Sequence, residues 1–435
     1  MAPKCQLFTL NLFFLAISVR ANAYVADGFF DDASQQVSDS VPFATMAELV
    51  RPEGYPFEEH IVQTQDGYLL SVYRIPAGLT VDSKLQQVGK PVVLLQHALL
   101  DCSASWVNNG GRASLAFILA DAGFDVWMPN VRGNTFSRKH ILWSPSDLEF
   151  WAFSWDEMAA YDLPASIDYI LQTTGQSSLG YVGHSQGTTM GFAALSSQPQ
   201  LAQKVNVAIM LAPVAFLGHI TSQPIEAMVR METDRMFELL GAKEFLPQRR
   251  AASDLYGKMC AQAPTFCLQA IEAICGYNDA NINITRLPLY LSYTPAGTSV
   301  QNMVHWAQGV RRKVEDQPKF AKYDYGQACV DSFGNAQPCN QAMYGSEEPP
   351  VYDLKAIQTP LAIFSGGQDL LSDSRDIDAL TNALPKEKVV EVLIEESYAH
   401  LDFVWGMDAH TLLYPSVKRL LTRYSGQYDS QWASA

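Results

Sequence analysis

Short apolar runs alternate with segments of helical periodicity along most of the chain. Runs of strand length occupy residues 92–96, 124–128, 179–182, 205–211, 360–365 and 389–394. Helices are predicted over residues 114–122, 156–173, 186–197, 376–384 and 412–424. Because a strand that is buried on both faces is apolar throughout, this order predicts an α/β fold, with a mostly parallel sheet and helices on both faces. Ahead of it, residues 59–64 and 69–75 flank a Gln-Asp-Gly turn and are predicted to form a hairpin.

The alternation stops after residue 211 and resumes only at residue 360. A parallel crossover needs only about a dozen residues, so an interval of about 145 predicts an inserted, mainly helical cap or lid. The expected organisation is a first core segment over 24–215, the cap over 216–355, a second core segment over 356–424 and a polar tail over 425–435. Two helical regions are predicted in the cap. One has a shared face of Val229, Met236, Phe237 and Leu240, and the other contains Cys260, Cys267 and Cys275.

The N-terminus has the three parts of a secretory signal peptide. Lys4 precedes an apolar run over residues 7–19, and Ala21-Asn22-Ala23 matches a cleavage site. The run is too short to span a bilayer, so cleavage after residue 23 and no transmembrane segment are expected. The sequon at Asn283 fits the same route. The mature protein is therefore expected to be secreted or to reside in a lysosomal or vacuolar lumen.

Composition narrows the class of protein. Hydrophobic residues make up 48% of the chain, which suits a large core. Lys and Arg number 30 against 45 Asp and Glu, for a formal charge of -15. A chain this acidic repels phosphate backbones, so nucleic acid is excluded as a partner. Six of the seven cysteines follow the signal segment, and the residues alone do not choose among their pairings.

The clearest chemical motif is Gly183-His184-Ser185-Gln186-Gly187, which matches G-x-S-x-G. The pentapeptide alone is weak, but a predicted strand enters it and a predicted helix leaves it. This is the setting of a nucleophile elbow, in which a sharp turn exposes the serine hydroxyl. The alternative is a structural glycine-rich turn. The context favours Ser185 as a nucleophile.

A serine nucleophile needs a histidine base and an orienting acid, which follow it in this chain order. Of the four later histidines, His400 follows the strand over 389–394, at the carboxyl edge where ligand sites gather. His219 and His305 fall in the cap, and His410 adjoins the last helix. Two aspartates compete for the acid. Asp369 directly follows the strand over 360–365, whereas Asp373 precedes a helix that it could cap.

Backbone N–H groups are expected to stabilise the developing oxyanion. One comes from the residue after the nucleophile, Gln186, and one from the loop after the strand over 92–96, where Leu99 is the best candidate. His97 in that loop is interpreted as a buried structural histidine.

With these residues assembled, the chain resembles the acid lipase family of gastric and lysosomal lipases. The matching stretches are SLAFILADAG (114–123), RGN (132–134), FWAF (150–153), YVGHSQGTT (181–189), PAGTSVQN (295–302) and HLDF (400–403). The resemblance covers about Gly54 to Asp408. It implies an α/β-hydrolase fold and a triad of Ser185, Asp369 and His400, since residues 366–371 match the family's acid segment at its first aspartate.

The resemblance also implies a function and a disulfide. It implies hydrolysis of triacylglycerols or cholesteryl esters at an oil–water or membrane interface, by a monomer without metal or coenzyme. A non-catalytic lipid-binding homologue and an acyltransferase are the alternatives. Cys260 and Cys267 resemble the family's cap disulfide, and Cys275 its free thiol. Ala98 departs from the family's usual glycine, which puts the shape of the oxyanion loop in question.

Overall fold

The computed structural model describes residues 44–79, 89–233, 236–237, 241–247, 258–311, 319–326, 329–330 and 336–426. The predicted signal segment, Leu240 and most of the polar tail lie outside these residues. Within them, no helix is both long and apolar enough to cross a membrane.

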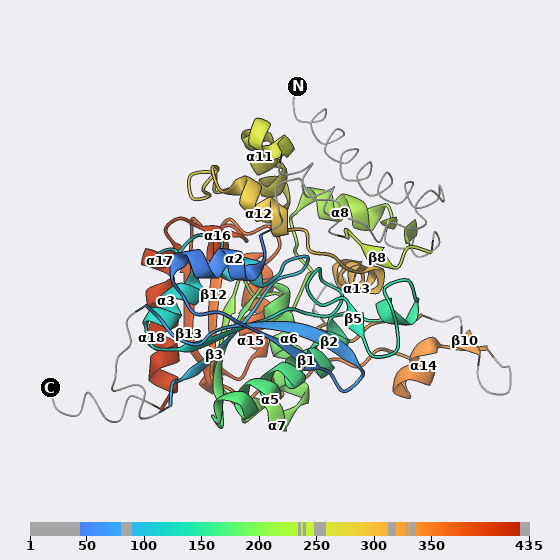
Figure 1. Cartoon of the computed structure of the whole chain (residues 1–435). Helices are drawn as coiled ribbons and strands as arrows, with labels where there is room; N and C mark the ends of the chain where they lie inside the picture. The colour runs from blue at the N-terminus through green and yellow to red at the C-terminus, as the bar shows by residue number, and fades with distance from the viewer. Residues whose placement is uncertain are drawn as a thin grey trace, which may run out of the picture.

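One large sheet organises the described residues (Figure 1). Its order is β1-β2-β4-β3-β6-β7-β12-β13, with β5 paired to β2. From β4 to β13 neighbouring strands are parallel, while β2 is antiparallel to β1, β4 and β5. The strands are β1 (Glu58–Gln63), β2 (Tyr68–Ile75), β3 (Val92–Gln96), β4 (Asp125–Pro129), β5 (Lys139–His140), β6 (Leu179–His184), β7 (Val205–Leu211), β12 (Leu361–Gly366) and β13 (Val389–Glu395). The predicted hairpin and mostly parallel sheet are confirmed.

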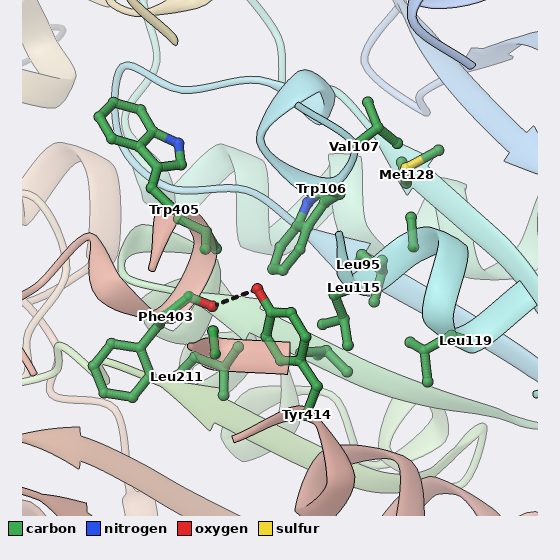
Figure 2. Packing of buried hydrophobic residues seen from close by; sticks show 14 of the residues in the cluster. Leu95, Trp106, Val107, Leu115, Leu119, Met128, Leu211, Phe403, Trp405 and Tyr414 are labelled. Atoms are coloured by element: carbon green, nitrogen blue, oxygen red, sulfur yellow. Dashed lines mark hydrogen bonds between the residues drawn. The ribbon is translucent and has the colours of Figure 1, made fainter. Parts of the chain in front are cut away.

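Helices cover both faces of this sheet. They are α2 (Met46–Val50), α3 (Leu115–Asp121), α4 (Trp155–Glu157), α5 (Leu163–Thr174), α6 (Gln186–Ser197), α7 (Pro199–Ala202), α15 (Ser374–Ala383), α16 (Asp402–Trp405), α17 (Ala409–Leu412) and α18 (Tyr414–Tyr424). Successive side chains of a strand point to opposite faces, so β3 contributes residues to the hydrophobic cores on both faces of the sheet. Leu95 packs with Trp106, Leu115 and Tyr414 on one face (Figure 2), and Leu94 belongs to the core on the other.

Two predicted helices contain a proline close to where an α-helical segment begins. The helix predicted over 156–173 is α4, then a π-helical turn (Met158–Asp162), then α5, with Pro164 in the first turn of α5. The helix predicted over 412–424 begins at Tyr414, with Pro415 in its first turn, and α17 precedes it. Proline lacks an N–H and its ring clashes with the carbonyl four residues earlier, so it fits the first turn of a helix, as at Pro415. Pro164 lies within a continuous helical run over 155–174, directly after the π-helical turn.

Between β7 and β12 the chain forms a mainly helical layer over one end of the sheet (Figure 1). Its described elements are α8 (Gln223–Arg230), β8 (Glu244–Phe245), α11 (Pro264–Cys275), α12 (Leu287–Tyr293), β9 (Thr298–Ser299), α13 (Val300–Arg311), β10 (Cys329–Val330), β11 (Ala336–Gln337) and α14 (Cys339–Tyr344). It contains disulfides Cys260–Cys267 and Cys329–Cys339. Cys275 and the core residue Cys102 are free.

The shared helical face predicted in this layer is wrong. Val229 lies on α8 and packs against Val214, Leu217 and Val310, whereas Phe237 packs in a separate cluster. The chain turns between them, at Glu232, with a left-handed φ of 52°. Met236 is exposed while its neighbour Phe237 is buried, so these two residues do not form one apolar surface.

Candidate active site

Ser185 stands at a strained turn between β6 and α6. Its φ of 53° and ψ of -118° are conformations that a residue with a Cβ rarely adopts. Neighbouring glycines allow the turn. A Cβ at Gly183 would lie 2.8 Å from the carbonyl carbon of Gly187, and a Cβ at Gly187 would lie 2.4 Å from the oxygen of Gln96. The glycines therefore let α6 start against both β6 and the end of β3.

His400 and Asp369 reach Ser185 from the loops after β13 and β12. The Ser185 Oγ lies 2.7 Å from His400 Nε2, and His400 Nδ1 lies 2.8 Å from Asp369 Oδ2. All three residues are buried. The other Asp369 oxygen, Oδ1, accepts hydrogen bonds from the backbone N–H groups of Leu371 and Ser372, each at 2.8 Å. The carboxylate is therefore held at both oxygens.

A close backbone contact brings the acid loop to the histidine loop. The Gln368 N–H donates to the Tyr398 carbonyl at 2.9 Å. A Cβ at Gly366 would lie 2.2 Å from that same oxygen, so only glycine fits there. This contact places Asp369, three residues after the end of β12, beside His400.

The competing aspartate has a different role. Asp373 caps α15, where its Oδ1 accepts from the Arg375 N–H at 2.9 Å, and its carboxylate pairs with the Arg375 side chain. The structure shows no contact between Asp373 and His400.

The other histidines considered as bases lie in other settings. His219 pairs with Asp376. His305 is buried and stacks on Trp155 with ring centroids 4.0 Å apart. His410 is exposed on α17.

Two further histidines are buried near the site and stay neutral. Burial lowers the pKa of His97 to about 4 and, with a smaller effect of His400, the pKa of His184 to about 3. His97 Nδ1 donates to the Ala98 carbonyl at 2.8 Å and its Nε2 accepts from the Val131 N–H at 3.2 Å. His184 Nε2 donates to the His400 carbonyl at 2.9 Å. Both rings thus fix backbone positions.

The two expected oxyanion donors lie in adjoining segments. Gln186 is the first residue of α6, and Leu99 follows the end of β3, against which α6 starts. The positive φ in this loop falls at Leu100, at 58°, and not at Ala98. Ala98 therefore sits in a backbone conformation that tolerates a Cβ, although the family usually has glycine there.

Side chains of the inserted layer contact the site, and the sequence analysis did not predict these contacts. Asn302 Nδ2 and Trp306 Nε1 on α13 both donate to Gln186 Oε1 at 2.9 Å. The His400 N–H donates to the carbonyl of Cys275, the last residue of α11, at 3.1 Å. Asn302 lies in one of the stretches that match acid lipases, which was the only available signal.

The free thiol of Cys275 adjoins the acid. Burial, with a smaller effect from Asp369, raises the pKa of this thiol well above its ordinary value.

The sequon residue Asn283 lies in the turn between α11 and α12, and its Oδ1 accepts from the Thr285 hydroxyl at 2.7 Å.

The fold and this arrangement of serine, histidine and aspartate are those of an α/β hydrolase. A family model described as alpha/beta hydrolase fold matches residues 91–407, and one described as partial alpha/beta-hydrolase lipase region matches residues 46–110. The chain belongs to the acid lipase family of these hydrolases.

Curated relatives align along nearly their whole length. The chain is 43% identical over 385 residues to lysosomal acid lipase/cholesteryl ester hydrolase of Homo sapiens, covering 87% of this chain and 91% of the relative. It is 40% identical over 409 residues to gastric triacylglycerol lipase of Homo sapiens, covering 93% and 96%. Lipase member M of Mus musculus is 42% identical over 394 residues, covering 89% and 87%.

Proposed function

We propose that this protein hydrolyses long-chain esters of neutral lipids, triacylglycerol or cholesteryl ester, through an acyl-enzyme on Ser185. The observation that carries the proposal is the buried hydrogen-bond chain from Ser185 through His400 to Asp369, at 2.7 and 2.8 Å. The activities named for the lysosomal and gastric relatives support the lipid substrate.

The geometry assigns a role to each side chain. His400 Nε2 accepts the Ser185 proton as Oγ attacks the ester carbonyl, and later returns it to the departing alcohol. Asp369 holds the Nδ1–H tautomer and stabilises the imidazolium that forms. A water molecule, activated by His400 in the same way, then attacks the acyl-enzyme and releases the fatty acid, and the proton returns to Ser185.

Backbone donors stabilise the tetrahedral intermediate. The N–H groups of Gln186 and Leu99 are the proposed oxyanion hole, where one donor is commonly worth ~10²–10³ in kcat. Asn302 and Trp306 hold the Gln186 side chain from α13 and so restrain the first of these donors.

The inserted layer is proposed to act as a cap over this site. The contacts of its helices α11 and α13 with the histidine loop and Gln186 support a role of residues 216–355 in controlling access. The protein is further proposed to act as a monomer, secreted or in a lysosomal or vacuolar lumen, with a glycan at Asn283 and a signal peptide at 1–23.

Pure protein assayed against triolein, cholesteryl oleate and p-nitrophenyl butyrate tests the proposal. Wild type should release fatty acid from at least one long-chain ester, and Ser185→Ala should lose at least a thousandfold on every substrate with an unchanged melting temperature. Ser185→Ala activity within tenfold of wild type would remove the nucleophile assignment. Binding of lipid without turnover would indicate a carrier, and ester formation with an added alcohol an acyltransferase.

A further inference from the structure

A short loop after β5 holds four large apolar side chains in water. In residues 141–148, the exposed fractions are 77% for Leu142, 64% for Leu148, 55% for Ile141 and 36% for Trp143. Single exposed apolar residues are common on protein surfaces, but a cluster on one eight-residue turn marks an interaction site. We refer to residues 141–148 as the apolar loop.

Hydrogen bonds satisfy successive backbone N–H groups of the apolar loop. His140 Nδ1 accepts from the N–H groups of Leu142 and Trp143, at 3.0 and 3.1 Å. The next N–H, of Ser144, donates to Asp147 Oδ2 at 2.7 Å. The Trp143 ring stacks on His140 with centroids 4.3 Å apart. These contacts fix the backbone of the loop, while its apolar side chains remain exposed to solvent.

Two carbonyls at the tip also accept hydrogen bonds. Pro145 O accepts from Trp151 Nε1 at 2.8 Å, and Ser146 O accepts from the Lys243 ammonium. These two carbonyls are therefore not available to a protein partner. A protein partner typically forms about one hydrogen bond per 100–200 Å² of interface, whereas hydrocarbon requires that backbone polar groups be satisfied internally.

The apolar loop adjoins the inserted layer that contacts the site. Arg138, just before β5, pairs with Glu244 on β8. β8 pairs with β9, which leads directly into α13. Asn302 and Trp306 on α13 hold Gln186. In Figure 1, β5 and β8 lie on the same side of the molecule as α13.

We propose that the apolar loop docks this protein on the surface of its lipid substrate, a step that rests on the proposed function. Leu142 and Leu148 enter the acyl region, and Trp143 lies at the boundary, where an indole meets both hydrocarbon and water. Insertion removes the apolar area from water while the N–H groups of Leu142, Trp143 and Ser144 keep their hydrogen bonds. Docking there holds the inserted layer against the lipid.

Binding is measured in the Ser185→Ala background, so that no turnover alters the lipid. The probes are phosphatidylcholine vesicles and phosphatidylcholine-coated triolein droplets, separated by flotation. Leu142→Ser with Leu148→Ser should lower the partition coefficient at least tenfold. The matched control is Leu412→Ser, a leucine 52% exposed on α17, which lies at the left of Figure 1 while β5 lies at the right. The control should stay within twofold.

In the active enzyme, the loop variant should lower the ratio of triolein to p-nitrophenyl butyrate activity at least fivefold. Equal partition of the loop variant and the control, with melting temperatures matched to the parent, would overturn the proposal. So would a concentration-dependent dimer of wild type that the loop variant abolishes, because the apolar loop would then bind a second copy. Absence of ester hydrolysis by wild type would refute the proposed function. The partition experiment uses an inactive variant, so its result would still decide whether the apolar loop binds lipid.

Discussion

Replacing Asp369 by asparagine should reverse the tautomer of His400. The Asp369 Oδ1 accepts from two backbone N–H groups, of Leu371 and Ser372. An asparagine must keep its carbonyl oxygen there, since an NH₂ would face two donors. Its NH₂ then occupies the Oδ2 position, 2.8 Å from His400 Nδ1. Facing a donor, Nδ1 becomes the acceptor, and the ring proton moves to Nε2.

The wrong tautomer directs an N–H at Ser185 Oγ, so the ring no longer accepts the serine proton. A loss of ~10⁴ in kcat is expected, as for the corresponding change in a serine protease triad. At ~1.36 kcal/mol per factor of ten, this is about 5.4 kcal/mol of transition-state stabilisation. The hydrogen bonds to the backbone survive, so little stability should be lost.

Asp373→Asn is the matched control, four residues along and the same in size. Asparagine caps a helix as well as aspartate does, and the pair with Arg375, whose side chain is 58% exposed, is worth ~0–1 kcal/mol. Its kcat should stay within threefold of wild type. The assay is kcat and KM on p-nitrophenyl butyrate, with melting temperatures for all three proteins. A kcat for Asp369→Asn within tenfold of wild type, or a thousandfold loss in Asp373→Asn alone, would refute the reasoning.

Three further predictions concern the surroundings of the site. Asn302→Ala leaves Gln186 Oε1 with fewer donors and should lower kcat at least tenfold at unchanged KM, measured on the soluble ester. An equal loss in a core variant that is distant from the site and destabilised to the same extent would contradict this. Burial raises the pKa of Asp101 to about 6, so the folded state binds this proton more tightly than the unfolded state. The contribution of Asp101 to the free energy of unfolding is therefore fully present below pH ~4, and it decreases by at most about 3 kcal/mol by pH 7. In denaturant titrations, the free energy of unfolding of Asp101→Asn should increase relative to that of wild type as pH rises from 4 to 7. An equal pH dependence in the two proteins would contradict the raised pKa. Burial also raises the thiol pKa of Cys102 and Cys275, so both should resist iodoacetamide at pH 8 until the protein is unfolded, and rapid native labelling would disprove it.

The local pattern of apolar and polar residues was sufficient to predict most of the fold. Continuous apolar runs between helical segments predicted the parallel strands, because strands buried on both faces must be apolar throughout. Strand, glycine-flanked serine and helix predicted the turn at Ser185, since these features lie within a few residues of one another. The order of residues after the serine and the carboxyl edge of the sheet then limited the histidine to His400 and the acid to two aspartates.

Tertiary contacts decided what local pattern left open. Asp369 and Asp373 are equally acidic and four residues apart. Only the contact of the Gly366 segment with the Tyr398 carbonyl determines which one reaches His400. The pairing of Cys329 with Cys339 likewise depends on where a separate hairpin brings them.

The turn at Glu232 and the contacts of the inserted layer could not be predicted from the sequence either. A helical period persists through a turn such as Glu232, so periodicity placed Val229 and Phe237 on one face although they pack in different clusters. The bonds from Asn302 and Trp306 to Gln186 join residues more than 100 positions apart. The sequence determined which residues are apolar, flexible or reactive. Only the folded chain decided which of them meet, because such contacts depend on the packing of segments distant along the chain.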